Sequence, residues 1–279
     1  MQNRIDQCFE ALRAGNEKAF IAYICAGDPD FPRTVDLAFA LEKAGTDILE
    51  LGLPFSDPLA DGLVNQLAAQ RALEAGATTR GVLDCVRQIR RLSQIPIVLY
   101  TYMNPIFQFG LERFHREATD AGVDGLLILD LPPEEDLDAQ TDGLLHIRLI
   151  APTTPPDRTE KICARAAGFI YYVSREGVTG VQSDVASSVG ERVAQIRQCT
   201  KLPIAVGFGI SNAEQAREVA QFADAIVVGS AIVQRIGESS AEPDMPTRIG
   251  NFVQPLVAAV KTSRSGGLQT ADSKAKGGL

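Results

Sequence analysis

Short apolar runs recur along the chain, and longer amphipathic segments separate them. Most of these runs are rich in Val, Ile and Leu and do not alternate with polar residues, which is typical of parallel strands buried on both faces. The strands that the pattern predicts are Ala19–Ile24, Asp47–Leu51, Ile97–Tyr102, Gly125–Leu129, His146–Ile150, Phe169–Ser174, Pro203–Gly207 and Ala225–Gly229.

The segments between these strands have the period of amphipathic helices. In one of them, Val82, Leu83, Val86 and Ile89 fall on a single helical face. A strand followed by a helix, eight times over, predicts an α/β fold, a (β/α)8 TIM barrel. A doubly wound sheet is the alternative, but it usually has fewer strands at this length and often a glycine-rich first turn.

Ahead of the first strand, an extra N-terminal helix is predicted from the apolar face of Ile5, Cys8, Phe9 and Leu12, as a plug on the barrel floor. We expect residues 1–262 to form a single TIM-barrel domain. Residues 263–279 are rich in Ser, Gly and Lys and are expected to be a disordered C-terminal tail.

Composition narrows the class of protein. The 279-residue chain has a net charge of -8 and no cluster of Lys and Arg, which argues against nucleic acid or an anionic membrane as the main partner. No apolar run approaches the roughly 18 residues of a membrane span. The N-terminus lacks an apolar signal region, and the five cysteines are scattered without a C-x-x-C motif. We therefore expect a cytoplasmic protein with reduced thiols and no metal site.

Two acids stand out. Glu50 lies within the second predicted strand and shares a strand face with Ile48 and Gly52, so it should point into the barrel. A salt bridge is a weak alternative, because Arg148 is the only Lys or Arg within the predicted strands. Asp61 lies on the following loop and is either a second functional acid, a plain loop aspartate or a helix N-cap. Asp28 and Asp57 are expected in turns.

Two connections are longer than an ordinary loop after a barrel strand: residues 54–63 and residues 175–188. Barrels keep their substrate contacts and lids on such loops. The loops after the seventh and eighth strands, Gly207–Ser211 and Gly229–Ala231, are short, rich in small residues and lead into helices. The N–H groups of Gly209, Gly229 and Ser230 can converge on one phosphate there, with tight turns as the alternative.

Apolar and aromatic residues near the strand ends are either core or the wall of a pocket: Tyr23, Tyr100, Tyr102, Leu127, Leu129 and Tyr171. Neither histidine, His115 or His146, is placed for a catalytic triad or a metal. The residues alone therefore indicate a barrel enzyme for a phosphorylated, partly apolar substrate that uses carboxylate acid/base chemistry without metal or cofactor.

The segment Leu49–Gly62, with the letters LELGLPFSDPLADG, resembles the signature of the tryptophan synthase alpha subunit family. Other segments match further motifs of that family, in order: Gly27–Pro29, Ser174–Gly180, Gly207–Ser211 and Gly229–Val233. The resemblance covers about Ile5 to Lys261. It implies cleavage of indole-3-glycerol phosphate to indole and glyceraldehyde 3-phosphate, a retro-aldol reaction.

The resemblance also implies roles for residues. Glu50 would be the general acid/base, Asp61 would bind the indole N–H, and Tyr171 would lie near the reacting carbons. Thr179 would close its loop over Asp61. The residues that would hold the phosphate are Gly180, Phe208, Gly209, Gly229 and Ser230. Those that would face the indole ring are Tyr23, Tyr100, Leu127 and Val227; some members have leucine in place of Tyr100.

By the same resemblance, this chain needs no cofactor, and its partner is a pyridoxal phosphate-containing beta subunit in an α2β2 heterotetramer. Leu63, where the family usually has proline, and Glu176 depart from the family pattern on the two long loops. Two alternatives stay open. One is a free-standing lyase that releases indole. The other is a non-catalytic barrel that docks on and activates a beta subunit.

Overall fold

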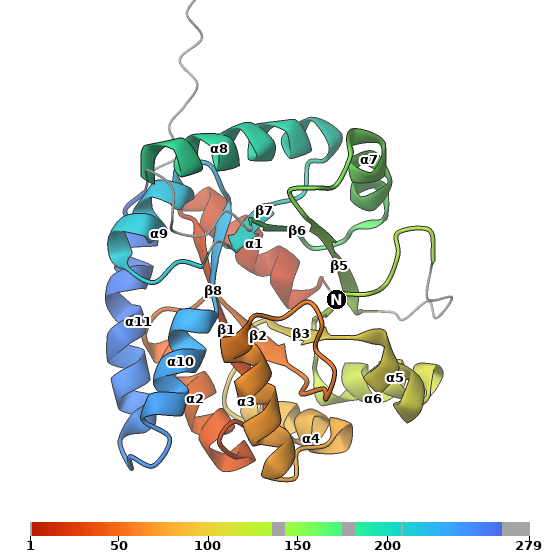
Figure 1. The fold of residues 1–279 in the computed structure, drawn as a ribbon, viewed down its shortest axis with the longest axis vertical. Helices are drawn as coiled ribbons and strands as arrows, with labels where there is room; N and C mark the ends of the chain where they lie inside the picture. Colours follow the sequence, from red (N-terminus) through yellow and green to blue (C-terminus); the bar gives the residue numbers. More distant parts are fainter. Residues whose placement is uncertain (1, 136–142, 175–181, 208, 264–279) are drawn as a thin grey trace, which may run out of the picture.

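The computed structural model describes residues 2–135, 143–174, 182–207 and 209–263. Its strands are all parallel and form a closed barrel, in which each strand pairs with the next and the last pairs with the first (Figure 1). The strands are β1 Ala19–Cys25, β2 Ile48–Gly52, β3 Ile97–Thr101, β4 Gly125–Ile128, β5 Leu145–Ile150, β6 Ile170–Val173, β7 Ile204–Gly207 and β8 Ala225–Val228. The predicted TIM barrel is confirmed, and no strand end differs from its predicted position by more than one residue.

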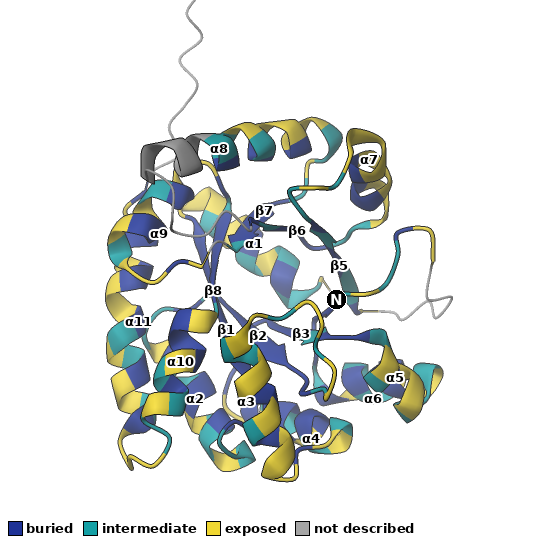
Figure 2. Ribbon diagram, viewed as in Figure 1, coloured by how far each residue is buried: buried dark blue, intermediate teal, exposed yellow. Residues whose placement is uncertain are grey.

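Helices surround the barrel and turn their exposed residues to the outside (Figure 2). They are α1 Arg4–Ala14, α2 Phe31–Lys43, α3 Leu63–Glu74, α4 Thr79–Arg90, α5 Met103–Phe109, α6 Leu111–Ala121, α7 Pro156–Arg165, α8 Gln182–Cys199, α9 Ala213–Ala220, α10 Ser230–Glu238 and α11 Met245–Lys261. None of the helices in the described ranges combines the length and apolar character of a membrane span.

Alternate strand residues build two cores. Leu49 and Leu51 of β2 point outward into the large core between the strands and the helices. Ile48, on the opposite face, packs inside the barrel with Val98 and Leu127. Glu50 and Gly52 share the face of Ile48, so the predicted inward orientation of Glu50 is confirmed.

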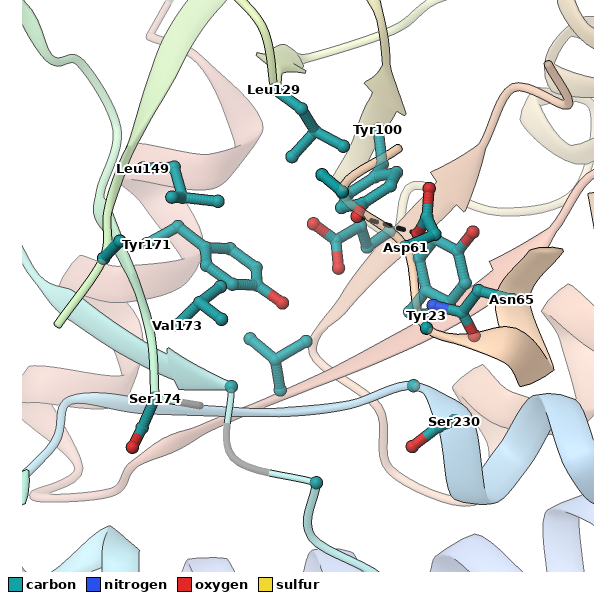
Figure 3. A pocket seen from close by; sticks show the side chains of 18 of the residues that line it. Tyr23, Asp61, Asn65, Tyr100, Leu129, Leu149, Tyr171, Val173, Ser174 and Ser230 are labelled. Carbon is teal, nitrogen blue, oxygen red and sulfur yellow. Dashed lines mark hydrogen bonds between the residues drawn. The ribbon is translucent and has the colours of Figure 1, made fainter. Parts of the chain in front are cut away.

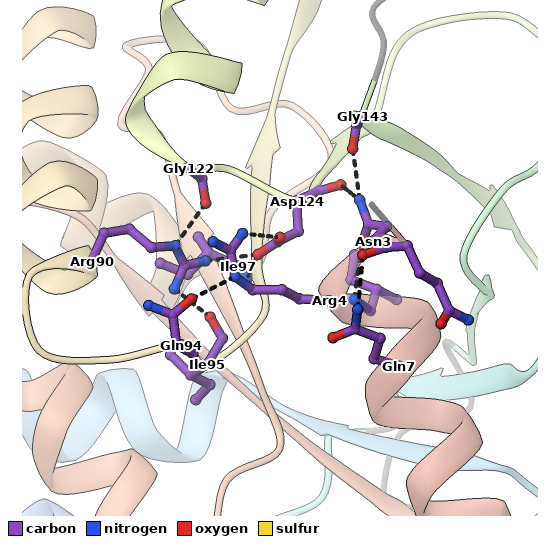
Figure 4. Close-up of polar contacts among 12 residues, drawn as sticks. Asn3, Arg4, Gln7, Arg90, Gln94, Ile95, Ile97, Gly122, Asp124 and Gly143 are labelled. Carbon is purple, nitrogen blue, oxygen red and sulfur yellow. Dashed lines mark hydrogen bonds and ion pairs between the residues drawn. The ribbon is translucent and has the colours of Figure 1, made fainter.

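The extra N-terminal helix, α1, is also confirmed, and it fills the floor of the barrel. Ile5 and Phe9 of α1 are buried in the inner core, where Phe9 packs on Phe169 with ring centroids 5.8 Å apart. Polar contacts around Asp124 attach the start of α1 to the barrel (Figure 4). With its floor filled in this way, the barrel is left with its cavity at the other end.

Most of the predicted tail, residues 264–279, lies outside the described residues. The single domain over residues 1–262 and the disorder of the tail therefore stay predictions.

Candidate active site

A cavity of about 820 Å³ lies at the carboxyl-terminal ends of the strands (Figure 3). In a barrel of this class, that end carries the catalytic residues and the long loops. The residues of its lining that bear on function are Tyr23, Glu50, Asp61, Asn65, Tyr100, Tyr171, Ser174, Gly209, Val227, Gly229 and Ser230.

Glu50 brings a carboxyl group into this cavity from the middle of β2. The residue is only 1% exposed, and neither carboxyl oxygen has a hydrogen-bond partner among the described residues. Burial, and secondly the charge of Asp61, raises the pKa of Glu50 to about 8. An unpaired, buried carboxyl group is unfavourable as an anion, so Glu50 holds a proton at neutral pH and can donate it.

Asp61 stands beside the cavity on the loop between β2 and α3. Its two oxygens accept hydrogen bonds from the hydroxyls of Tyr100, at 3.0 Å, and Tyr102, at 2.7 Å. The N-cap alternative is wrong, because the N-cap of α3 is Gly62. Asp61 is therefore the second acid of the cavity, held by two phenols.

Three tyrosines surround the acids: Tyr23 and Tyr171 are buried, and Tyr100 is partly buried. Burial is the main reason that the pKa of each is raised well above 10.0, so all three remain protonated and can donate. Figure 3 shows the Tyr171 ring reaching into the cavity from the side opposite Asp61.

Glycines on neighbouring strands give these rings their space. A Cβ on Gly52 would lie 2.5 Å from the Tyr23 hydroxyl, and one on Gly207 would lie 2.8 Å from the Tyr171 hydroxyl. Both distances are too short for any side chain, so the positions of the tyrosines depend on glycine at these two sites.

The other end of the cavity is built from small residues: Ser174, Gly207, Gly209, Gly229 and Ser230. Gly209 has a φ of +58°, and α10 begins at Ser230 without a side-chain cap. No Lys or Arg occurs among the described lining residues, so an anion bound here would rely on backbone N–H groups and the N-terminus of α10. Thr179, Gly180 and Phe208 lie outside the described residues.

Of the residues predicted to face the indole ring, all but one line the cavity. Tyr23, Tyr100 and Val227 line the cavity, as expected. Leu127 is fully buried in the inner core and does not line it. Of the two histidines, His115 is buried and stacks on His146, with centroids 5.9 Å apart and away from the cavity, which agrees with a packing role.

Sequence reasoning missed two features near the cavity. Asn65, in the first turn of α3, lines it, and its Oδ1 is buried without a partner among the described residues. Asp28 does more than form a turn: it is 1% exposed and makes a two-point ion pair with Arg71 of α3, at 2.8 and 2.7 Å. Such pairs join distant segments, and no local pattern in the sequence reveals them.

The fold and the site together define a barrel enzyme with two carboxyl groups at one end of its cavity and glycine and serine backbone at the other. The family model described as "Tryptophan synthase alpha chain" matches residues 9–261. The chain therefore belongs to the tryptophan synthase alpha chain family.

Individual relatives agree. The chain is 53% identical to the tryptophan synthase alpha chain of Opitutus terrae, over 93% of this chain and 99% of the relative. Its fold is similar to that of tryptophan synthase subunit alpha from Legionella pneumophila, with a TM-score of 0.85 and 40% identity over 93% of this chain and 99% of that one. A chain of tryptophan synthase from M. tuberculosis, in an aminoacrylate-bound form, gives a TM-score of 0.82 and 32% identity over 93% and 100%.

Proposed function

We propose that this chain is the carbon–carbon lyase of tryptophan biosynthesis that cleaves indole-3-glycerol phosphate to indole and glyceraldehyde 3-phosphate. The observation that carries the proposal is the placement of Glu50 and Asp61 in one cavity whose opposite end is lined by glycine and serine backbone. A substrate with an aromatic ring at one end and a phosphate at the other matches this division of the cavity.

The two acids have separate tasks. Glu50, protonated at neutral pH, gives its proton to C3 of the indole ring. The carboxylate that remains removes the proton from the hydroxyl on the adjoining carbon. The bond between that carbon and C3 then breaks, its electron pair returns to the ring, and the hydroxyl carbon leaves as an aldehyde. Asp61 accepts the ring N–H and stabilises the positive charge that the ring carries after protonation.

Other residues hold the substrate. The backbone N–H groups around Gly209, Gly229 and Ser230 bind the phosphate, together with those of Gly180 and Phe208. Tyr23, Tyr100 and Val227 pack against the indole ring, and Tyr171 stands near the reacting carbons. Thr179 closes its loop over Asp61 and excludes water.

A conservative substitution of the buried acid tests this function. We expect Glu50→Gln to lower kcat by about 10²-fold or more, because an amide cannot transfer the proton. The matched control is Glu74→Gln, at the exposed end of α3, which should leave kcat unchanged. A Glu50→Gln rate within a few-fold of wild type would reject the mechanism. A wild-type protein without turnover would favour the non-catalytic alternative.

We further propose that the chain docks on a beta subunit that carries pyridoxal phosphate, in an α2β2 assembly. Support comes from Leu59 and Leu63 at the rim of the cavity, which are 90% and 69% exposed. Apolar side chains so exposed beside an active site are typical of a protein interface.

Sedimentation of the chain mixed with a beta subunit tests the assembly, with lyase activity measured in parallel. We expect an α2β2 mass and a higher lyase rate, both lost in Leu59→Asp. Leu92→Asp is the control, because Leu92 is 82% exposed but does not line the cavity. An unassociated chain with full activity would instead support the free-standing lyase.

A further inference from the structure

We propose that Tyr100 is a positioning residue for this reaction: its hydroxyl acts with that of Tyr102 to fix the Asp61 carboxylate where it meets the ring N–H of the substrate. The inference rests on the proposed function, and it assigns to Tyr100 a polar task in addition to its apolar contact with the ring.

The first step of the argument is the position of Asp61 on an exposed loop. Residues 55–61 between β2 and α3 are at least partly exposed to solvent, and Ser56 and Asp57 are exposed. A side chain on such a segment has several rotamers open to it. The reaction requires a geometry held within a fraction of an ångström, so fixed elements must supply the anchors.

Both anchors come from β3 and the residue that follows it. Tyr100 donates to Oδ1 of Asp61 at 3.0 Å, and Tyr102, the N-cap of α5, donates to Oδ2 at 2.7 Å. The hydroxyl of Tyr102 also accepts from the N–H of Ala60 at 3.0 Å. Tyr102 alone would fix one oxygen and leave the carboxylate free to turn about it. Tyr100 supplies the second point, which sets the plane of the group (Figure 3).

Tyr100 is itself rigidly held. It lies within β3, opposite Gly52 on one side and Leu127 on the other. Its ring meets the edge of Tyr23 at a centroid distance of 5.1 Å, and the Tyr23 hydroxyl occupies the space above Gly52. Burial, and secondly the charge of Asp61, keeps the pKa of Tyr100 well above 10.0, so the phenol stays a donor.

Among the described lining residues, no Lys or Arg competes for this role. The lining of the cavity contains no Lys or Arg among the described residues, so phenols provide the side-chain hydrogen bonds to Asp61 that are seen there. Each oxygen keeps a further lone pair, with which it can accept the N–H of the ring.

The test removes a single oxygen atom. Tyr100→Phe keeps the ring that packs on Tyr23. Tyr172→Phe is the control, because Tyr172 is a buried tyrosine on the outward face of β6, away from the cavity. Two competitive ligands provide a readout that a purely structural role would not move: 3-(indol-3-yl)propyl phosphate and its benzothiophene counterpart, which has no N–H. Asp61→Ala, which has no side-chain acceptor, serves as the reference for lost N–H recognition.

We expect Tyr100→Phe to lower kcat about tenfold or more and to reduce the preference for the N–H ligand toward that of Asp61→Ala. Tyr172→Phe should change neither. An unchanged kcat and ligand preference in Tyr100→Phe would overturn the inference, as would an equal loss of affinity for both ligands. Absence of turnover in the wild-type protein would instead reject the proposed function.

Discussion

Burial of the Glu50 carboxyl group makes the stability of the fold depend on pH. Its pKa rises from the ordinary 4.5 to about 8 in the folded protein. Below pH 4.5 the group is protonated in both folded and unfolded chains and costs nothing. Between pH 4.5 and 8 the unfolded chain gives up this proton while the folded chain keeps it, so the free energy of unfolding falls by about 1.4 kcal/mol per pH unit.

A Glu50→Gln variant has no titrating group at this position and should escape that loss. We expect the difference in free energy of unfolding between the variant and the wild type to grow by about 3 kcal/mol, in favour of the variant, from pH 4.5 to pH 7. Urea unfolding at several pH values measures it, with Glu74→Gln as the exposed control. Wild-type and Glu50→Gln curves that run parallel with pH would contradict the prediction.

Single residues also show what the sequence does and does not reveal. Glu50 could be predicted because an acid inside an apolar strand is unusual whatever surrounds it. The role of Asp61 could not be decided, because its phenol partners lie about 40 residues away, one within β3 and one directly after it. The ion pair of Asp28 with Arg71 was missed for the same reason. Local patterns locate chemical groups, but partners distant in sequence determine what those groups do.

Among the elements, the ends of the strands could be predicted more accurately than the ends of the loops that follow them. A parallel strand buried on both faces leaves a continuous apolar run, so both ends of each of β1 to β8 could be predicted to within one residue. The loop over residues 54–62 is as long as expected, with α3 starting at Leu63. The sixth connection was expected to reach residue 188, but α8 begins at Gln182. Its first turn, Gln-Ser-Asp-Val, lacks the apolar period that marks the other helices.

At the scale of the whole molecule, one buried acid, Asp124, links α1 on the barrel floor to the barrel wall. Asp124 is 2% exposed; its Oδ1 accepts from Arg4 of α1 at 2.8 Å, and its Oδ2 accepts from Arg90 of α4 at 2.7 Å. The N–H of Ile97, at the start of β3, also donates to this carboxylate at 2.8 Å. The Asp124 side chain therefore connects α1, β3 and α4.

The two arginines of this cluster should differ in importance, because they differ in burial. The side chain of Arg90 is 9% exposed and that of Arg4 is 35% exposed. Asp124→Asn removes the carboxylate that is hydrogen-bonded to the buried guanidinium of Arg90 and should lower the free energy of unfolding by about 3 kcal/mol or more. Arg4→Met removes a partly solvated pair and should cost less than about 1 kcal/mol.

Urea unfolding of both variants checks this order, and a lyase assay well below the unfolding transition separates stability from function. The Asp124 cluster involves the start of β3, whereas the cavity is lined from the other ends of the strands. Both variants should therefore keep wild-type kcat and KM while folded. If Arg4→Met were as destabilising as Asp124→Asn, the charge of Asp124 would serve mainly to attach α1. The larger loss expected for Asp124→Asn requires instead that its main task is to neutralise Arg90 inside the wall that supports β3.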